Sequence, residues 1–247
     1  MKKVGILLVL LALVLAGSVP ALAAGKLRVA TDATFPPFEF VDEKGREVVG
    51  FDIDIIKEIG RRLGMTVEII NTAWDGLLPG LKTGKFDVVI AGMTITDERA
   101  QAVDFSDPYF ATGQVILVRP DTTDIKEPAD LKGKVVAVQI GTTGHFAAQK
   151  IQGLKRIDTY DTYPAAFLAL KMRKADAVIA DELVAKEEQR ANPGQVRVVG
   201  RPFTVEYYGI AVNKGRTDLL RQINRALALM KADGTYDAIY EKWFGAE

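Results

Sequence analysis

Residues that could bind charged groups follow an apolar stretch at 86–91. Gly92 ends this stretch, and Thr94 and Arg99 come soon after it. The guanidinium of an arginine is a planar fork of N–H donors that matches the two oxygens of a carboxylate. This segment therefore suggests a site for a small molecule that carries a carboxylate.

A second polar group, "GTTG" at 141–144, follows the apolar stretch 135–140 and opens a predicted helix. Backbone amides at a helix N-terminus favour an anion, so Gly141, Thr142 and Thr143 are candidates for the same carboxylate. Helix capping alone would also explain this turn, because threonine is a preferred N-cap residue.

Two carboxylates also follow predicted strands. Asp181 comes directly after the apolar stretch 177–180, and Asp32 comes after the first predicted strand. Asp181 and the hydroxyl of Thr94 suit a cation that donates hydrogen bonds, such as an ammonium. A carboxylate site beside an ammonium site matches the α-carbon end of a free amino acid.

Two aromatic residues, Phe35 and Trp74, lie near the same predicted strand ends. Aromatic rings can sandwich an aliphatic or guanidinium side chain. Asp32 could then receive the far polar end of that side chain.

Each of these residues also has an explanation that needs no ligand. Arg99 could pair with a neighbouring surface carboxylate, Trp74 could belong to the core, and Asp181 could cap the next helix. His145, the single histidine, is expected at the surface near a helix start, as neither a base nor a metal ligand.

The elements that position these residues occur in two blocks, before and after about residue 113. The first block has the order βαβαβ, which predicts a largely parallel sheet. In such sheets ligands bind at the carboxyl ends of the strands, where the polar groups lie. Strands are expected at 27–30, 67–70, 86–91, 115–118, 135–140, 177–180, 196–199 and 208–212, and helices at 51–63, 77–83, 130–134, from 146, and at 163–172, 182–190, 218–231 and 236–243.

Composition excludes several classes of function. The 247 residues include 32 Lys+Arg, 32 Asp+Glu and no Cys. Zero net charge argues against a nucleic-acid or anionic-membrane partner, since both attract a basic surplus. The lack of cysteine excludes disulfides, thiol catalysis and thiolate metal sites. We expect no metal and no cofactor.

Residues 1–23 have the features of a secretory signal peptide. A short basic start, "MKK", precedes the apolar run 6–15, and "ALA" at 21–23 is a signal-peptidase pattern, with cleavage predicted after Ala23. A membrane anchor is the alternative, but the run is shorter than the roughly 20 apolar residues that span a bilayer. Because no cysteine follows that could carry a lipid, we expect a soluble, exported, periplasmic protein.

A series of long segments, in order from about Leu27 to the end of the chain, carries a family resemblance. They are "TDATFPPFEF" (31–40), "GFDIDIIKEIGRRLG" (50–64), "AGMTITDERAQAVDFSDPYF" (91–110), "VVAVQIGTTG" (135–144), "ADAVIADE" (175–182), "YYGIAV" (207–212) and "DGTYDAIYEKWFG" (233–245). In this order they resemble the polar amino-acid-binding proteins of bacterial ABC importers, solute-binding protein family 3, including its arginine- and glutamine-binding members.

The resemblance implies an α/β fold of the periplasmic-binding-protein type II. Two α/β lobes are joined by two hinge strands and close over the ligand. Lobe 1 would comprise 27–109 and 209–247, and lobe 2 would comprise 114–204. The hinges would lie near 110–113 and 205–208.

The resemblance also assigns roles at the α-carbon end of the ligand. Arg99 would bind the carboxylate with the backbone amides of Thr94 and Thr143. Asp181, the carbonyl of Gly92 and the hydroxyl of Thr94 would take the ammonium. The neighbouring residues Thr142, Ala91, Met93 and Gly141 are included in the predicted site.

At the side-chain end, Phe35 and Trp74 would flank the ligand and Asp32 would contact its tip. Gln139 stands where some glutamine-binding members have lysine, and phenylalanine is common at the position of Trp74. A neutral Gln139, together with Asp32 and Glu39, makes this pocket acidic. Arginine or another cationic amino acid is therefore the expected ligand, with glutamine as the alternative.

The resemblance implies a monomeric solute-binding protein that delivers an amino acid to the permease of an ABC importer. A dehydratase acting on cyclic carboxylic acids is the rival class on the same fold, with Asp181 or Glu182 as its acid or base. The sensing domain of a receptor is a third class. It usually has transmembrane and signalling segments in the same chain, which we do not expect here.

Overall fold

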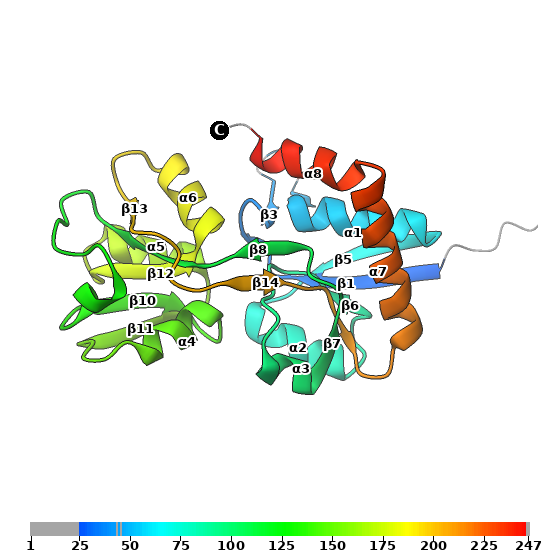
Figure 1. The fold of residues 1–247 in the computed structure, drawn as a ribbon, viewed down its shortest axis with the longest axis horizontal. Helices are drawn as coiled ribbons and strands as arrows, with labels where there is room; N and C mark the ends of the chain where they lie inside the picture. The colour runs from blue at the N-terminus through cyan, green and yellow to red at the C-terminus, as the bar shows by residue number, and fades with distance from the viewer. Residues whose placement is uncertain (1–24, 43, 45, 246–247) are drawn as a thin grey trace, which may run out of the picture.

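The computed structural model of the protein describes residues 25–42, 44 and 46–245, and contains two α/β lobes that lie side by side (Figure 1). The predicted two-lobed α/β fold is confirmed. The predicted signal peptide at 1–23 lies outside the described residues. None of the helices in the described part of the chain combines the length and hydropathy that crossing a membrane requires.

Lobe 1 is built on a five-stranded sheet with the order β5-β1-β6-β15-β7. Its strands are β1 (Gly25–Thr31), β5 (Met65–Asn71), β6 (Val88–Val89), β7 (Val103–Phe105) and β15 (Ala211–Asn213). One face is covered by α1 (Phe51–Arg62) and α7 (Thr217–Ala232), and the other by α2 (Trp74–Lys82). The lobe is completed by β2 (Thr34–Phe35), β3 (Glu39–Val41), β4 (Val48–Val49), α3 (Asp97–Ala102) and α8 (Thr235–Phe244).

The sheet is largely parallel, as predicted, with one strand, β15, running against the others. β1 is parallel to β5 and to β6, as the βαβαβ order predicts. β15 is antiparallel to both of its neighbours, β6 and β7. The reason lies in where the chain enters this strand. It comes from the hinge, which lies near the carboxyl ends of the parallel strands, so β15 must run in the opposite direction.

Lobe 2 repeats this arrangement with the strand order β11-β10-β12-β9-β13. Its strands are β9 (Gln114–Val118), β10 (Val135–Gln139), β11 (Arg156–Tyr160), β12 (Ala177–Asp181) and β13 (Arg197–Val199). Its helices are η1 (Pro128–Leu131), α4 (Thr143–Lys150), α5 (Tyr163–Lys171) and α6 (Glu182–Ala191). β10 is parallel to β11 and β12, whereas β9, which arrives from the hinge, is antiparallel to β12 and β13.

Two short antiparallel strands, β8 (Phe110–Thr112) and β14 (Glu206–Tyr208), run between the lobes (Figure 1). The single strand predicted at 208–212 is wrong, because its residues divide between β14 and β15. Gly209 lies at the division, where a Cβ atom would be 2.8 Å from the side chain of Ile95. The backbone at Gly209 therefore packs tightly against Ile95 of lobe 1, and β14 ends just before this contact.

Helix α1 shows how the sequence pattern produces an element that packs on the sheet. Phe51, Ile55 and Ile59 recur at helical spacing and are all fully buried. The helix ends before Gly64, which has a φ of 67°, a left-handed conformation that favours glycine. This buried face packs against β5 and the core of lobe 1.

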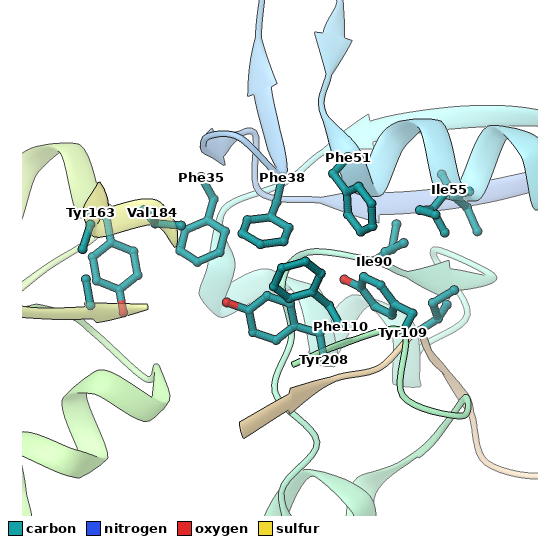
Figure 2. Close-up of a cluster of buried hydrophobic side chains, with 14 of the residues drawn as sticks. Phe35, Phe38, Phe51, Ile55, Ile90, Tyr109, Phe110, Tyr163, Val184 and Tyr208 are labelled. Atoms are coloured by element: carbon teal, nitrogen blue, oxygen red, sulfur yellow. The ribbon is translucent and has the colours of Figure 1, made fainter. Parts of the chain in front are cut away.

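The core of lobe 1 continues through the hinge as an aromatic cluster (Figure 2). Phe38 packs edge-on against Phe110 of β8, with ring centroids 4.9 Å apart, and against Tyr208 of β14, at 5.3 Å. Phe35 packs against Tyr163 of lobe 2 at 5.5 Å. Apolar packing therefore runs without interruption from lobe 1, along the hinge, to the surface where the lobes meet.

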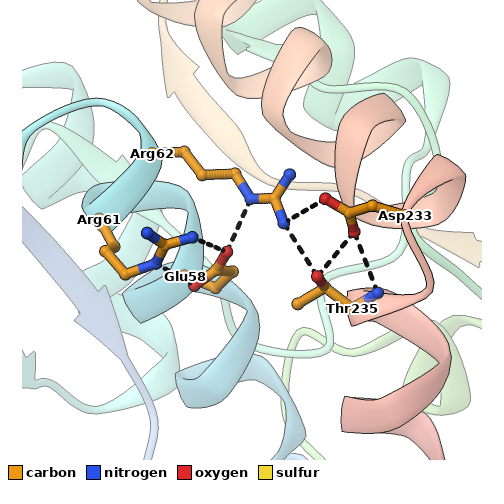
Figure 3. A network of polar contacts seen from close by, with 5 residues as sticks. All are labelled: Glu58, Arg61, Arg62, Asp233 and Thr235. Carbon is orange, nitrogen blue, oxygen red and sulfur yellow. Dashed lines mark hydrogen bonds and ion pairs between the residues drawn. The ribbon is translucent and has the colours of Figure 1, made fainter.

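A polar network holds the C-terminal helix to α1 (Figure 3). The guanidinium of Arg62 donates to Glu58 at 2.7 Å and to Thr235 at 2.9 Å, and pairs with Asp233 at 2.9 Å. Phe244, near the other end of α8, has its ring 5.0 Å from that of Phe51. α8 is thus an integral part of lobe 1 and of its aromatic cluster.

Candidate ligand-binding site

A cavity of about 320 Å³ lies between the lobes. It is lined by Asp32, Phe35, Glu39, Trp74, Ala91, Gly92, Thr94, Arg99, Gln139, Thr142, Thr143, Tyr163 and Asp181. Most of these residues end or shortly follow β1, β6, β10 or β12. They therefore lie at the carboxyl ends of parallel strands, where α/β sheets bind ligands.

The carboxylate candidate Arg99 is buried and does not pair with its acidic neighbours in α3. Its guanidinium donates to the carbonyls of Thr94 at 2.8 Å and of Gly141, in lobe 2, at 3.2 Å. Its Cζ lies 5.1 Å from the centre of the Trp74 ring, a cation–π contact. Burial lowers the pKa of Arg99 from 12.5, and the negative charges of Asp181 and Glu206 oppose this shift. An arginine stays charged under these conditions, and its further N–H donors remain for a ligand.

The turn at the start of α4 caps the helix and lines the cavity at the same time. Thr142 is the N-cap residue, and its hydroxyl accepts a hydrogen bond from the amide of His145 at 3.2 Å. Thr143 lines the cavity at the first position of the helix. The capping explanation is therefore correct for Thr142, and it does not remove this residue from the cavity wall.

The cation candidate Asp181 occupies the N-cap position of α6, but its side chain makes no capping hydrogen bond. It accepts hydrogen bonds from the hydroxyls of Tyr208, at 2.8 Å, and Tyr163, at 3.4 Å. Burial, reinforced by the charge of Glu206, raises the pKa of Asp181 to about 7. A cation bound at this carboxylate would favour its ionised form.

The two cavity threonines share a partner in the hinge. The hydroxyls of Thr94 and Thr143 donate to Oε2 of Glu206, at 2.9 and 2.7 Å. Glu206 belongs to β14 and is 8% exposed. A buried carboxylate thus lies directly behind the cavity wall, beside Asp181.

The opposite end of the cavity contains Asp32 and Gln139, which come from different lobes. The side-chain amide of Gln139 donates to Asp32 at 3.1 Å, and Thr34 donates to the other oxygen of Asp32 at 3.0 Å. Burial raises the pKa of Asp32, and these two hydrogen bonds oppose the shift. Asp32 retains acceptor capacity, because an ionised carboxylate accepts about four hydrogen bonds.

Glu39 and Asp52 form a buried acidic pair beside the cavity. Burial, together with the negative charge of Asp52, holds the pKa of Glu39 well above its usual range, so Glu39 carries the proton of the pair. Asp52 accepts from the amide of Gly92 at 2.8 Å and from the hydroxyl of Tyr109 at 2.7 Å. Glu39 therefore adds little negative charge to the cavity, and Asp32 supplies the charge at this end.

Gly92 is required by close packing as well as by backbone conformation. Its φ is 50°, and a Cβ atom here would lie 2.6 Å from Cε1 of Phe35. The absence of a side chain lets the Phe35 ring lie against the backbone at the end of β6. Phe35 and Gly92 thus form one wall of the cavity.

The predicted site residues come together in this cavity, with two exceptions. Met93 is buried in the part of the lobe 1 core that packs against α2. Gly141 does not line the cavity, but its carbonyl accepts a hydrogen bond from Arg99. Sequence reasoning missed Tyr163, which lines the cavity, and Glu206 and Tyr208, which contact its lining residues. Glu206 and Tyr208 lie in the predicted hinge at 205–208. The acidic residue in this otherwise apolar and aromatic segment was the one sequence signal that could have pointed to them.

The described residues contain no group of three or more His, Asp or Glu side chains arranged to hold a metal ion. The polar groups of the cavity instead form two sets of opposite character. Arg99 and the α4 N-terminus suit an anion, whereas Asp181 and the two threonines suit a cation. This arrangement fits a zwitterion.

Known proteins resemble this chain over nearly its whole length. A family model described as bacterial extracellular solute-binding proteins, family 3, matches residues 27–246. The L-cystine-binding protein TcyJ of Escherichia coli K12 is 37% identical over 90% of this chain and 84% of its own. The ABC transporter arginine-binding protein 1 of the same strain is 39% identical over 99% of both chains. A solved structure of an ancestral arginine-binding protein bound to glutamine is 52% identical, with a TM-score of 0.86, over 90% of this chain and 98% of the other.

Proposed function

Because the chain belongs to family 3 of the bacterial extracellular solute-binding proteins, we propose that it captures a polar L-amino acid in the periplasm and delivers it to the permease of an ABC importer. Its relatives are amino-acid-binding proteins, which supports this class of function. The observation that carries the proposal is that Arg99 and Asp181, with opposite charges, line one interlobe cavity. These two residues match the carboxylate and the ammonium of an amino acid.

The charges around the cavity favour a cationic side chain. Arg99 supplies one positive charge, whereas Asp32, Asp181 and Glu206 are carboxylates in or directly behind the wall. In L-arginine the carboxylate would pair with Arg99, the ammonium with Asp181 and the guanidinium with Asp32, so each charge of the ligand has a partner. Glutamine is the alternative ligand, because its amide can also donate to Asp32.

Closure of the lobes would trap the ligand between them. In this structure the lobes are joined across the cavity by the hydrogen bonds from Arg99 to Gly141 and from Gln139 to Asp32. A ligand that contacts residues of both lobes binds the closed form more tightly than the open one and shifts the population toward it. The permease would then recognise the closed form, since only this form presents both lobes in a fixed relative orientation.

A ligand screen tests this function. We expect cationic L-amino acids, arginine most of all, to raise the melting temperature, and calorimetry to show a single site. A ligand at 100 times its dissociation constant adds roughly 2.7 kcal/mol to the free energy of unfolding. If glutamine stabilises more than arginine, the alternative ligand is correct. If no amino acid stabilises the protein, the proposed function is wrong.

Asp32→Asn is expected to weaken binding of arginine more than binding of glutamine. Hydrogen bonds to a charged group contribute about 1.5–3 kcal/mol and neutral ones about half of that, so the affinity for arginine should fall on the order of tenfold or more. Asparagine keeps an acceptor for the glutamine amide. Calorimetry with both ligands measures the difference.

Asp75→Asn is the matched control, because Asp75 is exposed near Asp32 without lining the cavity. This variant removes the same charge and should leave the ratio of the two affinities unchanged. Equal losses for arginine and glutamine in Asp32→Asn would show that Asp32 does not select for positive charge.

A further inference from the structure

Glu206 is a buried acid in the hinge that no role at the ligand explains. Its Oε1 accepts a hydrogen bond from the hydroxyl of Thr204 at 2.8 Å, and that hydroxyl accepts from the amide of Gln114, also at 2.8 Å. Its Oε2 accepts from Thr94, Thr143 and the side-chain amide of Gln114. Both carboxylate oxygens are therefore held in place, and Oε2 is aimed at the cavity wall.

The two threonines bonded to Oε2 come from different lobes. Thr94 follows β6 in lobe 1, and Thr143 begins α4 in lobe 2. Their hydroxyl oxygens are 3.4 Å apart, and both residues line the cavity. One oxygen of a hinge residue thus binds a hydroxyl from each lobe where the lobes meet.

The direction of these hydrogen bonds decides what the threonines offer a ligand. A hydroxyl has a single proton to donate and lone pairs to accept with. An ionised carboxylate only accepts, so Thr94 and Thr143 must each point their proton at Glu206. Thr143 also accepts from the side-chain amide of Gln114 at 3.2 Å, which uses one of its two lone pairs. What the two hydroxyls still offer a ligand is acceptor capacity, which suits an ammonium and disfavours a carboxylate.

We propose that Glu206 is a positioning residue that accepts one hydroxyl hydrogen bond from each lobe on closure and so orients Thr94 and Thr143 as acceptors for the ammonium of the ligand. This inference rests on the proposed amino-acid-binding function. Glu206 does not line the cavity; it acts through the two threonines and through its charge on Asp181.

A double-mutant cycle tests whether Glu206 acts through the threonines. At pH 8, Glu206→Gln and Thr94→Val are each expected to raise the dissociation constant of the amino acid about tenfold or more, since charge-assisted hydrogen bonds are the strong ones. The double variant should bind little more weakly than Glu206→Gln alone, because Thr94→Val then removes an interaction that is already lost. Multiplied effects in the double variant would overturn the proposal.

The pH dependence of binding is the second measurement. Asp181 is faced by Glu206 and Tyr208 of β14, Tyr163 of α5, Arg99 of α3 and Glu39 of β3. Its raised pKa means that the ionised form is lost as the pH falls through about 7, so the affinity of the wild type should fall below that pH. Glu206→Gln removes a negative neighbour of Asp181 and should move this loss of affinity to lower pH. An unmoved profile would contradict the proposal, since a purely structural role would not change it.

Controls separate the possible failures. Glu241→Gln makes the same change of charge on an exposed residue of α8 and should leave affinity and pH profile unchanged. If Glu206→Gln does not fold, Thr94→Val and Thr143→Val are measured as single variants instead. Each should raise the dissociation constant about tenfold, because each removes an acceptor for the ammonium, and unchanged affinity in both would overturn the proposal. If the wild type binds no amino acid, both the proposed function and this inference fail; if it binds and the cycle is additive, only the inference fails.

Discussion

Arg99→Ala is expected to remove amino-acid binding as measured by calorimetry. Arg99 is 7% exposed and is fixed by the carbonyls of Thr94 and Gly141, so its guanidinium is oriented before a ligand arrives. Removing one partner of a buried, hydrogen-bonded charge pair costs roughly 2–5 kcal/mol. At about 1.4 kcal/mol for each tenfold change, the affinity should fall by roughly thirtyfold to several thousandfold.

Two further variants make this result specific. Arg225→Ala removes an exposed arginine of α7 and should bind as the wild type does. Arg99→Lys keeps the charge but loses the planar fork, and should lie between the wild type and Arg99→Ala. If Arg99→Ala keeps submicromolar affinity while remaining folded, the carboxylate of the ligand binds elsewhere.

Asp181→Asn is expected to have the second large effect, a loss of affinity of about two orders of magnitude for any α-amino acid. The amide has nearly the shape of the carboxylate but no charge to pair with the ammonium, and its NH2 group cannot accept from Tyr208. The loss should be similar for arginine and glutamine, because both have the same α-carbon end. This distinguishes Asp181 from Asp32, at the other end of the cavity.

Glu182→Gln is the matched control, because it removes a charge from the adjacent residue, which pairs with Lys186 on α6. Its affinity should be unchanged. The same variants bear on the enzyme alternative, for which an acid with a pKa near 7 would be a suitable catalyst. Turnover of prephenate or arogenate by the wild type that Asp181→Asn abolishes would replace binding by catalysis as the function.

The parts of the fold predicted from sequence are those fixed by local pattern. The buried face of α1 and the apolar strands β10 and β12 have the spacing and side chains of their final structure. β11 was missed because its residues, 156–160, are largely polar, as an edge strand of a sheet allows. The short strands β2, β3 and β4 are too brief to show any periodicity.

Local pattern predicts the direction of only some of the strands. The βαβαβ order gives the direction of β1, β5 and β6, but β15 and β9 owe theirs to the two crossings of the hinge. These crossings depend on contacts between distant parts of the chain, which a single sequence does not display.

The candidate site divides in the same way. Residues that directly follow strands, such as Thr94, Thr143 and Asp181, could be found because carboxyl ends of parallel strands gather at one edge. Glu206 and Tyr208 escaped detection because their partners are remote; Thr94 and Glu206 are 112 residues apart in sequence. The residues that would bind the charged groups of the ligand could thus be predicted from the sequence. The residues that orient those side chains could not.

The strand order of lobe 1 has a consequence for how the protein acquires its structure. β15, at 211–213, lies between β6 and β7, both of which precede lobe 2 in the chain. A nascent chain that ends before residue 211 therefore has a gap in the lobe 1 sheet, while lobe 2 already has all of its strands. Closing so long a loop is entropically costly and slow. Lobe 2 should thus fold first. Lobe 1, which contains both ends of the described chain, should complete its sheet later, when β15 pairs with β6 and β7.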